Sequence, residues 1–157
     1  MVQIQSEILF SSPEDTAHFA QYLAAHLKPG DVVLLSGGIG AGKTHLARAA
    51  IQALLEVPED VPSPTFTLVQ TYDTAKGELW HADLYRLTDP SELVELGLTD
   101  AFEEAISFVE WPDRLGSLCP PNALVLDLQL AAEDDARHLT AQSASDRWAF
   151  VKDYTAK

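Results

Sequence analysis

A glycine-rich segment in the first third of the chain has residue types suited to holding a phosphate group. Residues 37–44 read Gly-Gly-Ile-Gly-Ala-Gly-Lys-Thr and fit the pattern G-x-x-x-x-G-K-[ST]. The glycines let backbone N–H groups approach an anion, and a helix that starts here points the positive end of its dipole at the same place. Lys43 would reach the β- and γ-phosphates, and the Thr44 hydroxyl would bind Mg²⁺. The residues predicted to contact a nucleotide are Gly38, Ile39, Gly40, Ala41, Gly42, Lys43, Thr44 and His45.

Two acidic residues are candidates for holding the Mg²⁺ ion, directly or through water. Glu110 ends the apolar run at residues 106–109, which resembles a Walker B element, and Asp83 lies in the segment 81–87. Acids at the ends of buried strands usually fill this role in phosphoryl-transfer sites. Each acid taken alone is equally compatible with a surface or structural role. The aromatic residue Trp111 could be core, a partner contact or a wall of the nucleotide site, with core the commonest case for a tryptophan.

The glycine-rich loop is expected between a buried strand and a helix. Val32 to Leu35 form an apolar run without alternation, which is typical of a central parallel strand buried on both faces. Residues 43–55 place apolar side chains at helical spacing. Strand, loop and helix therefore form one β-loop-α unit of the kind that binds phosphate.

The rest of the chain supplies further strands and helices around this unit. We predict strands at residues 2–10, 106–109, 123–130 and 138–141, a hairpin at 65–72 and 78–84, helices at 13–27 and 90–96, and a solvated turn at 131–136. Residues 1–157 are expected to form a single α/β P-loop NTPase domain with a central, mostly parallel sheet, helices on both faces and antiparallel additions. The last few residues are expected to be a flexible tail.

Composition excludes several classes of protein. The chain has 24 Asp and Glu against 10 Lys and Arg, a formal net charge of −14, which is the wrong sign for direct, high-affinity binding to a nucleic-acid backbone. The single cysteine, Cys119, cannot form an internal disulfide, and its thiol is expected to be buried or inert. No segment has the pattern of a signal peptide or a membrane span, so a cytoplasmic protein without a membrane role is expected.

Two other classes of P-loop protein fit poorly. A GTPase would normally carry an Asn/Thr-Lys-x-Asp motif that reads guanine, and no lysine here has that setting. A small-molecule kinase normally needs several arginines to clamp the transferred phosphate. The arginines here, at positions 48, 86, 114, 137 and 147, are not clustered. A kinase nevertheless stays an alternative.

Four motifs in order resemble one family, the TsaE P-loop ATPases of bacterial tRNA threonylcarbamoyladenosine biosynthesis. They are Gly-Ala-Gly-Lys-Thr at 40–44, Ser-Pro-Thr-Phe-Thr-Leu-Val at 63–69, His-Ala-Asp-Leu-Tyr-Arg-Leu at 81–87 and Val-Glu-Trp-Pro at 109–112. The resemblance implies a protein that binds ATP and Mg²⁺, hydrolyses ATP slowly by itself and acts on a complex of TsaB and TsaD. That complex places threonylcarbamoyl on the adenosine next to the anticodon, so this chain would meet tRNA only indirectly. A subunit that gates assembly by nucleotide occupancy, without required hydrolysis, is a further alternative.

The resemblance also implies roles for individual residues. Lys43, Asp83 and Glu110 would be catalytic, Thr44 and Glu110 would hold Mg²⁺, and Trp111 would lie beside the nucleotide. Residues 63–67 correspond to a switch-like segment. Arg137 matches an arginine of the family's C-terminal region and is expected to contact nucleotide, although a surface salt bridge explains it equally well. The family usually has an acid where Gly38 stands and Thr or Ser where His45 stands, so any role of those two side chains is open.

Overall fold

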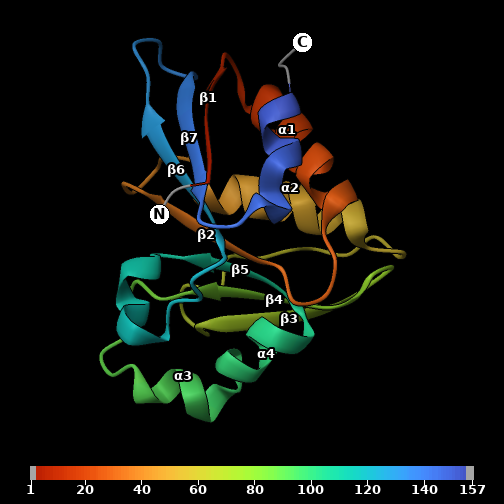
Figure 1. The fold of residues 1–157 in the computed structure, drawn as a ribbon, viewed down its shortest axis with the longest axis vertical. Coiled ribbons are helices and arrows are strands. Elements are labelled where there is room, and N and C mark those ends of the chain that lie inside the picture. The colour runs from red at the N-terminus through yellow and green to blue at the C-terminus, as the bar shows by residue number, and fades with distance from the viewer. Residues whose placement is uncertain (1–2, 155–157) are drawn as a thin grey trace.

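The computed structural model describes residues 3–154, and within them seven strands form one sheet in the order β1-β7-β6-β2-β5-β4-β3 (Figure 1). The inner strands β6, β2, β5 and β4 are parallel, whereas β1, β7 and β3 pair antiparallel to their neighbours. The predicted tail lies outside the described residues. The strand bounds are β1 (Ile4–Phe10), β2 (Val32–Gly37), β3 (Val69–Thr74), β4 (Gly77–Asp83), β5 (Ile106–Glu110), β6 (Leu124–Leu130) and β7 (Arg137–Ser143).

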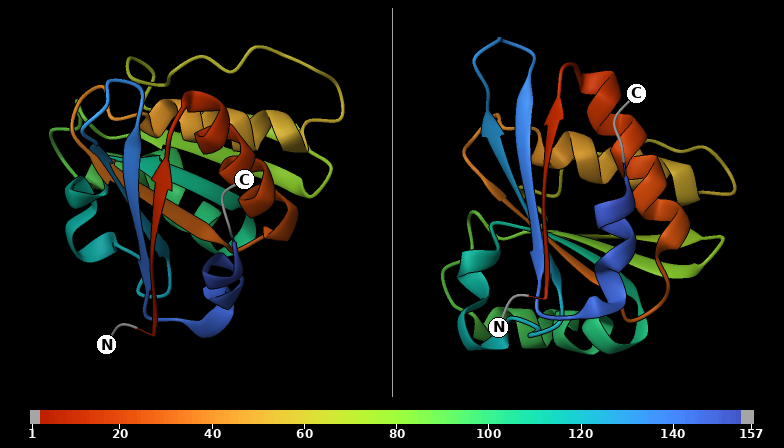
Figure 2. Two further views of the ribbon diagram at one scale, coloured as in Figure 1. Left: turned by 90° about the horizontal axis from the view of Figure 1, so that it is seen from above. Right: turned by 45° about the horizontal axis from the view of Figure 1, so that its top comes forward.

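Helical segments cover both faces of the sheet (Figures 1 and 2). On one face, α1 (Pro13–His26), α2 (Lys43–Leu54) and the 3₁₀ segment η2 (Asp146–Asp153) pack against the larger apolar core. On the other face, α3 (Ser91–Leu96), α4 (Leu98–Glu104) and the 3₁₀ segment η1 (Pro112–Leu118) bury a second, smaller core. The predicted α/β architecture is therefore confirmed.

Strand β2 lies in the middle of the sheet because its side chains are apolar on both faces. Val33 and Leu35 belong to the larger core, while Val32 and Leu34 belong to the smaller one. β2 pairs in parallel with both β5 and β6, as its unbroken apolar run predicts. The loop that follows Gly37 therefore opens at the carboxyl edge of the parallel strands, where α/β proteins bind ligands.

Helix α1 has defined caps at both ends. Ser12 accepts a hydrogen bond from the Asp15 amide and Pro13 occupies the first turn, so the predicted start of the helix is confirmed. At the other end, Lys76 from the β3–β4 turn donates to the carbonyls of Ala24, Ala25 and Leu27. This lysine adds a charged donor to the carbonyls at the end of the helix, where the Ala24 carbonyl also accepts from the Leu27 amide, and it joins the hairpin to α1.

Several boundaries differ from the predicted ones. The hairpin strand predicted at 65–72 begins only at Val69, because residues 65–67 form a turn and Leu68 has a positive φ of 68°. Helix α4 and both 3₁₀ segments were not predicted, although the shorter helix α3 was found within the helix predicted at 90–96. Cys119 is exposed rather than buried, and partial desolvation raises the pKa of its thiol.

The length and hydropathy of the helices were compared with those of a membrane-spanning helix. No helix within residues 3–154 is both long enough and apolar enough to span a lipid bilayer.

Candidate nucleotide-binding site

The loop between β2 and α2 has a backbone that only glycine can supply at its first position. Gly37 has a φ of +130°, and a Cβ there would lie 2.2 Å from the carbonyl oxygen of Leu128 on β6. The loop ends at Gly42, whose φ of +105° turns the chain into the first residue of α2. These glycines bring the N-terminus of α2 up to the carboxyl edge of the sheet, where its dipole favours an anion.

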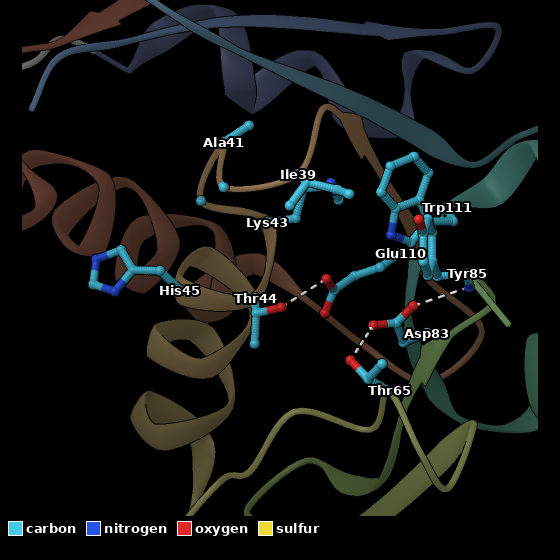
Figure 3. A pocket seen from close by; sticks show the side chains of 12 residues that line it. Ile39, Ala41, Lys43, Thr44, His45, Thr65, Asp83, Tyr85, Glu110 and Trp111 are labelled. Atoms are coloured by element: carbon cyan, nitrogen blue, oxygen red, sulfur yellow. Dashed lines mark hydrogen bonds between the residues drawn. The ribbon is translucent and has the colours of Figure 1, made fainter. Parts of the chain in front are cut away.

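A cavity of about 410 Å³ opens beside this loop (Figure 3). It is bounded by the loop itself, the start of α2, the ends of β4 and β5 and the segment around Thr65. The lining residues are Ile39, Gly40, Ala41, Gly42, Lys43, Thr44, His45, Thr65, Asp83, Tyr85, Glu110 and Trp111. The structure thus brings together most of the predicted site residues from three separate stretches of sequence.

Lys43 is buried at the base of the loop. Its Nζ donates to the carbonyl oxygens of Gly37 at 2.7 Å and Gly38 at 2.9 Å, and lies 4.1 Å from the centroid of the Trp111 ring. Desolvation lowers the pKa of Lys43, and the carboxylates of Glu110, Asp83 and Asp127 oppose that shift. A phosphate in the cavity would give this desolvated ammonium an additional anionic partner.

Thr44 and Glu110 form the contact expected of a Mg²⁺ site. Thr44 Oγ1 donates to Glu110 Oε1 at 2.7 Å, although the residues lie on different elements. The described residues contain no cluster of three or more His, Cys, Asp or Glu that could hold a metal alone. A hydroxyl and one carboxylate fit Mg²⁺, which in nucleotide sites keeps several waters and takes further oxygens from phosphate. The two residues therefore fit a nucleotide-bound Mg²⁺ ion.

Asp83 ends β4 directly beside Glu110, since the two residues are paired in the β4–β5 register. Its Oδ2 accepts a 2.9 Å hydrogen bond from Thr65 Oγ1, and its Oδ1 accepts one from the Tyr85 amide. Figure 3 shows these contacts on the side of the cavity opposite His45. Asp83 therefore ties the predicted switch-like segment, residues 63–67, to the cavity.

The aromatic wall consists of Trp111 and Tyr85. Their ring centroids are 4.9 Å apart, and Trp111 has a positive φ of 59°, which turns the chain directly after Glu110. Trp111 packs against the smaller core on one side and lines the cavity on the other. Trp111 therefore lines the cavity, and its position beside a nucleotide stays a prediction.

Two predicted contact residues do not line the cavity. Gly38 contributes its carbonyl to Lys43. Arg137, on β7, donates to the carbonyls of Ala41 at 3.1 Å and Gly40 at 3.4 Å and forms no ion pair within the described residues. The salt-bridge explanation for Arg137 is therefore wrong, and the arginine holds the loop from outside. Its predicted contact with nucleotide is untested.

His45 lines the edge of the cavity and also joins two helices. Its Nε2 hydrogen-bonds the carbonyl of Pro13 at 2.9 Å, so the first turns of α1 and α2 are linked. The side chain that stands in place of the family's Thr or Ser thus has a structural contact.

Sequence reasoning did not assign Thr65, Tyr85 and His81 individually. Thr65 and Tyr85 line the cavity, and His81 contacts Glu110 from inside the sheet. Their positions depend on the pairing of β4 with β5, which short sequence patterns do not specify. The only available signal was their location inside two of the four motifs.

Comparisons with known proteins agree with the motifs. The family described as "Threonylcarbamoyl adenosine biosynthesis protein TsaE" matches residues 10–139. The tRNA threonylcarbamoyladenosine biosynthesis protein TsaE of Rickettsia bellii is 38% identical over 134 residues, covering 85% of this chain and 93% of the relative. The protein of the same name from Bacillus subtilis is 36% identical, covering 87% and 85%.

A solved structure has a similar fold. The crystal structure of Bacillus subtilis YdiB superimposes with a TM-score of 0.78 at 29% identity, covering 98% of this chain and 94% of that one. The motifs, the fold and the relatives lead to one conclusion: this chain belongs to the TsaE family of tRNA threonylcarbamoyladenosine biosynthesis proteins.

Proposed function

We propose that this chain binds Mg²⁺-ATP in the cavity beside residues 37–44 and hydrolyses it slowly when alone. The observation that carries the proposal is the 2.7 Å contact between Thr44 and Glu110 next to the buried ammonium of Lys43. Hydroxyl, carboxylate and ammonium are the groups a P-loop site uses on a nucleoside triphosphate and its metal. Family membership supports a role for this hydrolysis in threonylcarbamoylation of tRNA.

Each residue of the site has a distinct task in this proposal. The loop amides, the α2 dipole and Lys43 bind the phosphates. Thr44 and Glu110 hold the Mg²⁺ ion, which neutralises phosphate charge when bound. Asp83, the register partner of Glu110, orients a water or polar group through its carboxylate, which accepts from Thr65 in this structure.

The contact between Asp83 and Thr65 supports a conformational switch in residues 63–67 that responds to the γ-phosphate. Thr65 lies within the segment 63–67, and its hydroxyl also hydrogen-bonds Ser63 at 2.7 Å. A γ-phosphate beside Asp83 would compete for these hydroxyls and order the segment differently, as in other P-loop switches. This contact also favours the second candidate function, in which nucleotide occupancy gates assembly and hydrolysis is not required.

The partners in this proposal are homologues of TsaB and TsaD. The chain's net charge of −14 disfavours a direct grip on tRNA, and its acidic surface would instead face basic surfaces of these partners in the cytoplasm. Retention of tRNA by the isolated chain at physiological salt would contradict this indirect role.

A small-molecule kinase is less well supported. Among residues 3–154, the cavity lining contains no arginine to clamp a transferred phosphate. Stoichiometric phosphorylation of a metabolite by the isolated chain would replace the proposed function with a kinase function.

Calorimetric titration with ATP and Mg²⁺ tests nucleotide binding directly. The wild type is expected to bind, and Lys43→Ala is expected to lose binding because the buried ammonium is gone. Lys152→Ala, an exposed lysine on η2, is the matched control and should bind as the wild type does. A wild type without affinity for ATP would contradict the proposal.

The partner-dependent part is tested with purified TsaB and TsaD homologues. The chain is expected to co-purify with them more strongly with ATP than without it, and its phosphate release should rise in their presence. Equal modification of tRNA with ATP and with a non-hydrolysable analogue, over many turnovers, would favour the occupancy-gated alternative.

A further inference from the structure

His81 is a fully buried histidine that the proposed function leaves without a task. It lies on β4, with 0% of its surface exposed, and its Nε2 is 2.7 Å from Glu110 Oε2. Glu110 is itself only 2% exposed. Buried polar groups in such close contact are costly to break, because the partner left behind loses its hydrogen bond.

The β4–β5 register explains why this histidine reaches Glu110. His81 pairs with Phe108, two residues before Glu110 on the same face of β5. A side chain at such a diagonal position lies within reach of a long neighbour. The Glu110 carboxylate thus has two hydrogen-bond partners, His81 on the neighbouring strand β4 and Thr44 on α2.

The carboxylate of Glu110 determines which atom donates in its contact with His81. A carboxylate only accepts, so the proton in the contact with Glu110 is on Nε2 of His81. The other ring nitrogen, Nδ1, is buried and has no hydrogen-bond partner among the described residues.

Both oxygens of Glu110 are therefore held. Oε1 accepts from Thr44 and Oε2 accepts from His81, each at 2.7 Å. A glutamate side chain has three rotatable bonds, and an unrestrained carboxylate would sample several orientations. The donor at Oε2 keeps Oε1 directed at the Thr44 hydroxyl.

We propose that His81 is a positioning residue that holds the Glu110 carboxylate in the orientation needed to share a Mg²⁺ ion with Thr44. The proposal rests on the proposed function, since it assumes that Mg²⁺ binds there with nucleotide. Residues that hydrogen-bond a ligating carboxylate commonly set metal affinity in this way. His81 does not touch the nucleotide or the ion.

Two substitutions distinguish the effect of the hydrogen-bond donor of His81 from the effect of the space that its ring fills. The side-chain nitrogen of His81→Gln reaches about as far from the backbone as Nε2 does and can donate to Glu110, whereas His81→Leu fills space without a donor. We expect His81→Leu to lower the affinity for Mg²⁺ in the presence of ATP, raising the apparent Kd for Mg²⁺ about tenfold. Titration calorimetry measures this Kd. His81→Gln should restore most of that affinity. ATP binding without Mg²⁺ should be the same in both variants.

Three results would contradict either the positioning role of His81 or the proposed function on which it rests. Wild-type Mg²⁺ affinity in a folded His81→Leu variant, or equal losses in His81→Gln and His81→Leu, would overturn the proposal. A wild type whose ATP binding does not depend on Mg²⁺ would instead overturn the proposed function. If His81→Leu does not fold, His81→Asn serves in its place, because its shorter side chain carries a polar group that stops short of Glu110.

A double substitution adds an independent readout. In a Glu110→Gln background the carboxylate is gone, so His81→Leu should change the apparent Kd for Mg²⁺ no further. Additive losses would show that His81 acts by some route other than Glu110 and would overturn the proposal.

Discussion

Thr44 Oγ1 donates a 2.7 Å hydrogen bond to Glu110 Oε1, so the first turn of α2 meets the last residue of β5 inside the cavity. The two residues are far apart in the sequence and meet only because β2 and β5 are parallel neighbours. This contact places a hydroxyl and a carboxylate where one Mg²⁺ ion can bind both.

Removing the Thr44 hydroxyl should therefore remove the effect of Mg²⁺. Thr44→Val has nearly the same shape but no oxygen, and we expect it to lose about tenfold to a hundredfold in Mg²⁺-dependent ATP turnover. Thr44→Ser keeps the hydroxyl and is the matched control. The measurement is phosphate release against Mg²⁺ concentration. Equal Mg²⁺ dependence in the Val and Ser variants would show that this hydroxyl is not a ligand.

Gly37→Ala should destabilise the fold. The added Cβ would meet the Leu128 carbonyl at 2.2 Å in a left-handed backbone conformation, which we expect to cost about 2–4 kcal/mol in free energy of unfolding. Gly38→Ala is the control for stability, because its Cβ would have no atom within 4 Å. Urea unfolding monitored by circular dichroism gives both values. Similar stability of the two variants would contradict the close approach of β2 and β6.

Arg137→Met should loosen the phosphate loop. The substitution keeps the apolar stem and removes the donors to the loop carbonyls of Gly40 and Ala41 as well as those to the carbonyls of Asp134 and Ala136, so we expect a loss of about 1 kcal/mol in stability together with weaker ATP binding. Arg114→Met, at an exposed position, is the control. Thermal unfolding and calorimetry check both effects. Weaker binding with unchanged stability would instead indicate direct contact between Arg137 and nucleotide.

Tyr72→Phe should change stability mainly at alkaline pH. The Tyr72 hydroxyl is buried without a partner among residues 3–154, and desolvation raises its pKa above the usual value of 10.0. Above pH 10 the unfolded chain releases this proton while the folded chain keeps it, so stability falls as the pH rises. Tyr72→Phe removes that contribution and flattens the decline.

The control for Tyr72 is Tyr22, whose hydroxyl donates to the Phe150 carbonyl at 2.7 Å. At neutral pH, Tyr22→Phe should cost about 1 kcal/mol, whereas Tyr72→Phe should cost nothing, because no hydrogen bond is lost. Denaturant unfolding between pH 7 and alkaline pH measures both. A clear loss of stability in Tyr72→Phe at neutral pH would reveal a bond that the structure does not contain.

The sequence was informative where local pattern and burial coincide. The apolar run at 32–35 and the helical spacing after Lys43 predicted β2 and α2, and the motif between them predicted the loop. The pairing of Asp83 with Glu110 and the contact of His81 with Glu110 depend instead on the register of β4 against β5. No local pattern specifies that register, so the acids were predicted and their buried partners were not.

Arg137 illustrates the same limit. The family resemblance linked it to nucleotide, but its contacts with Gly40 and Ala41 arise because β7 passes beside the loop across nearly a hundred residues of sequence.

The central claim is that ATP turnover at Glu110 supports repeated rounds of tRNA modification. Its most direct test is threonylcarbamoyladenosine formed per molecule of complex, measured with purified TsaB and TsaD homologues and either the wild type or Glu110→Ala under saturating ATP. The wild type should support many rounds, and Glu110→Ala should stop at about one round per complex because it binds nucleotide but cannot turn it over. Normal multiple-turnover modification with Glu110→Ala would contradict the account.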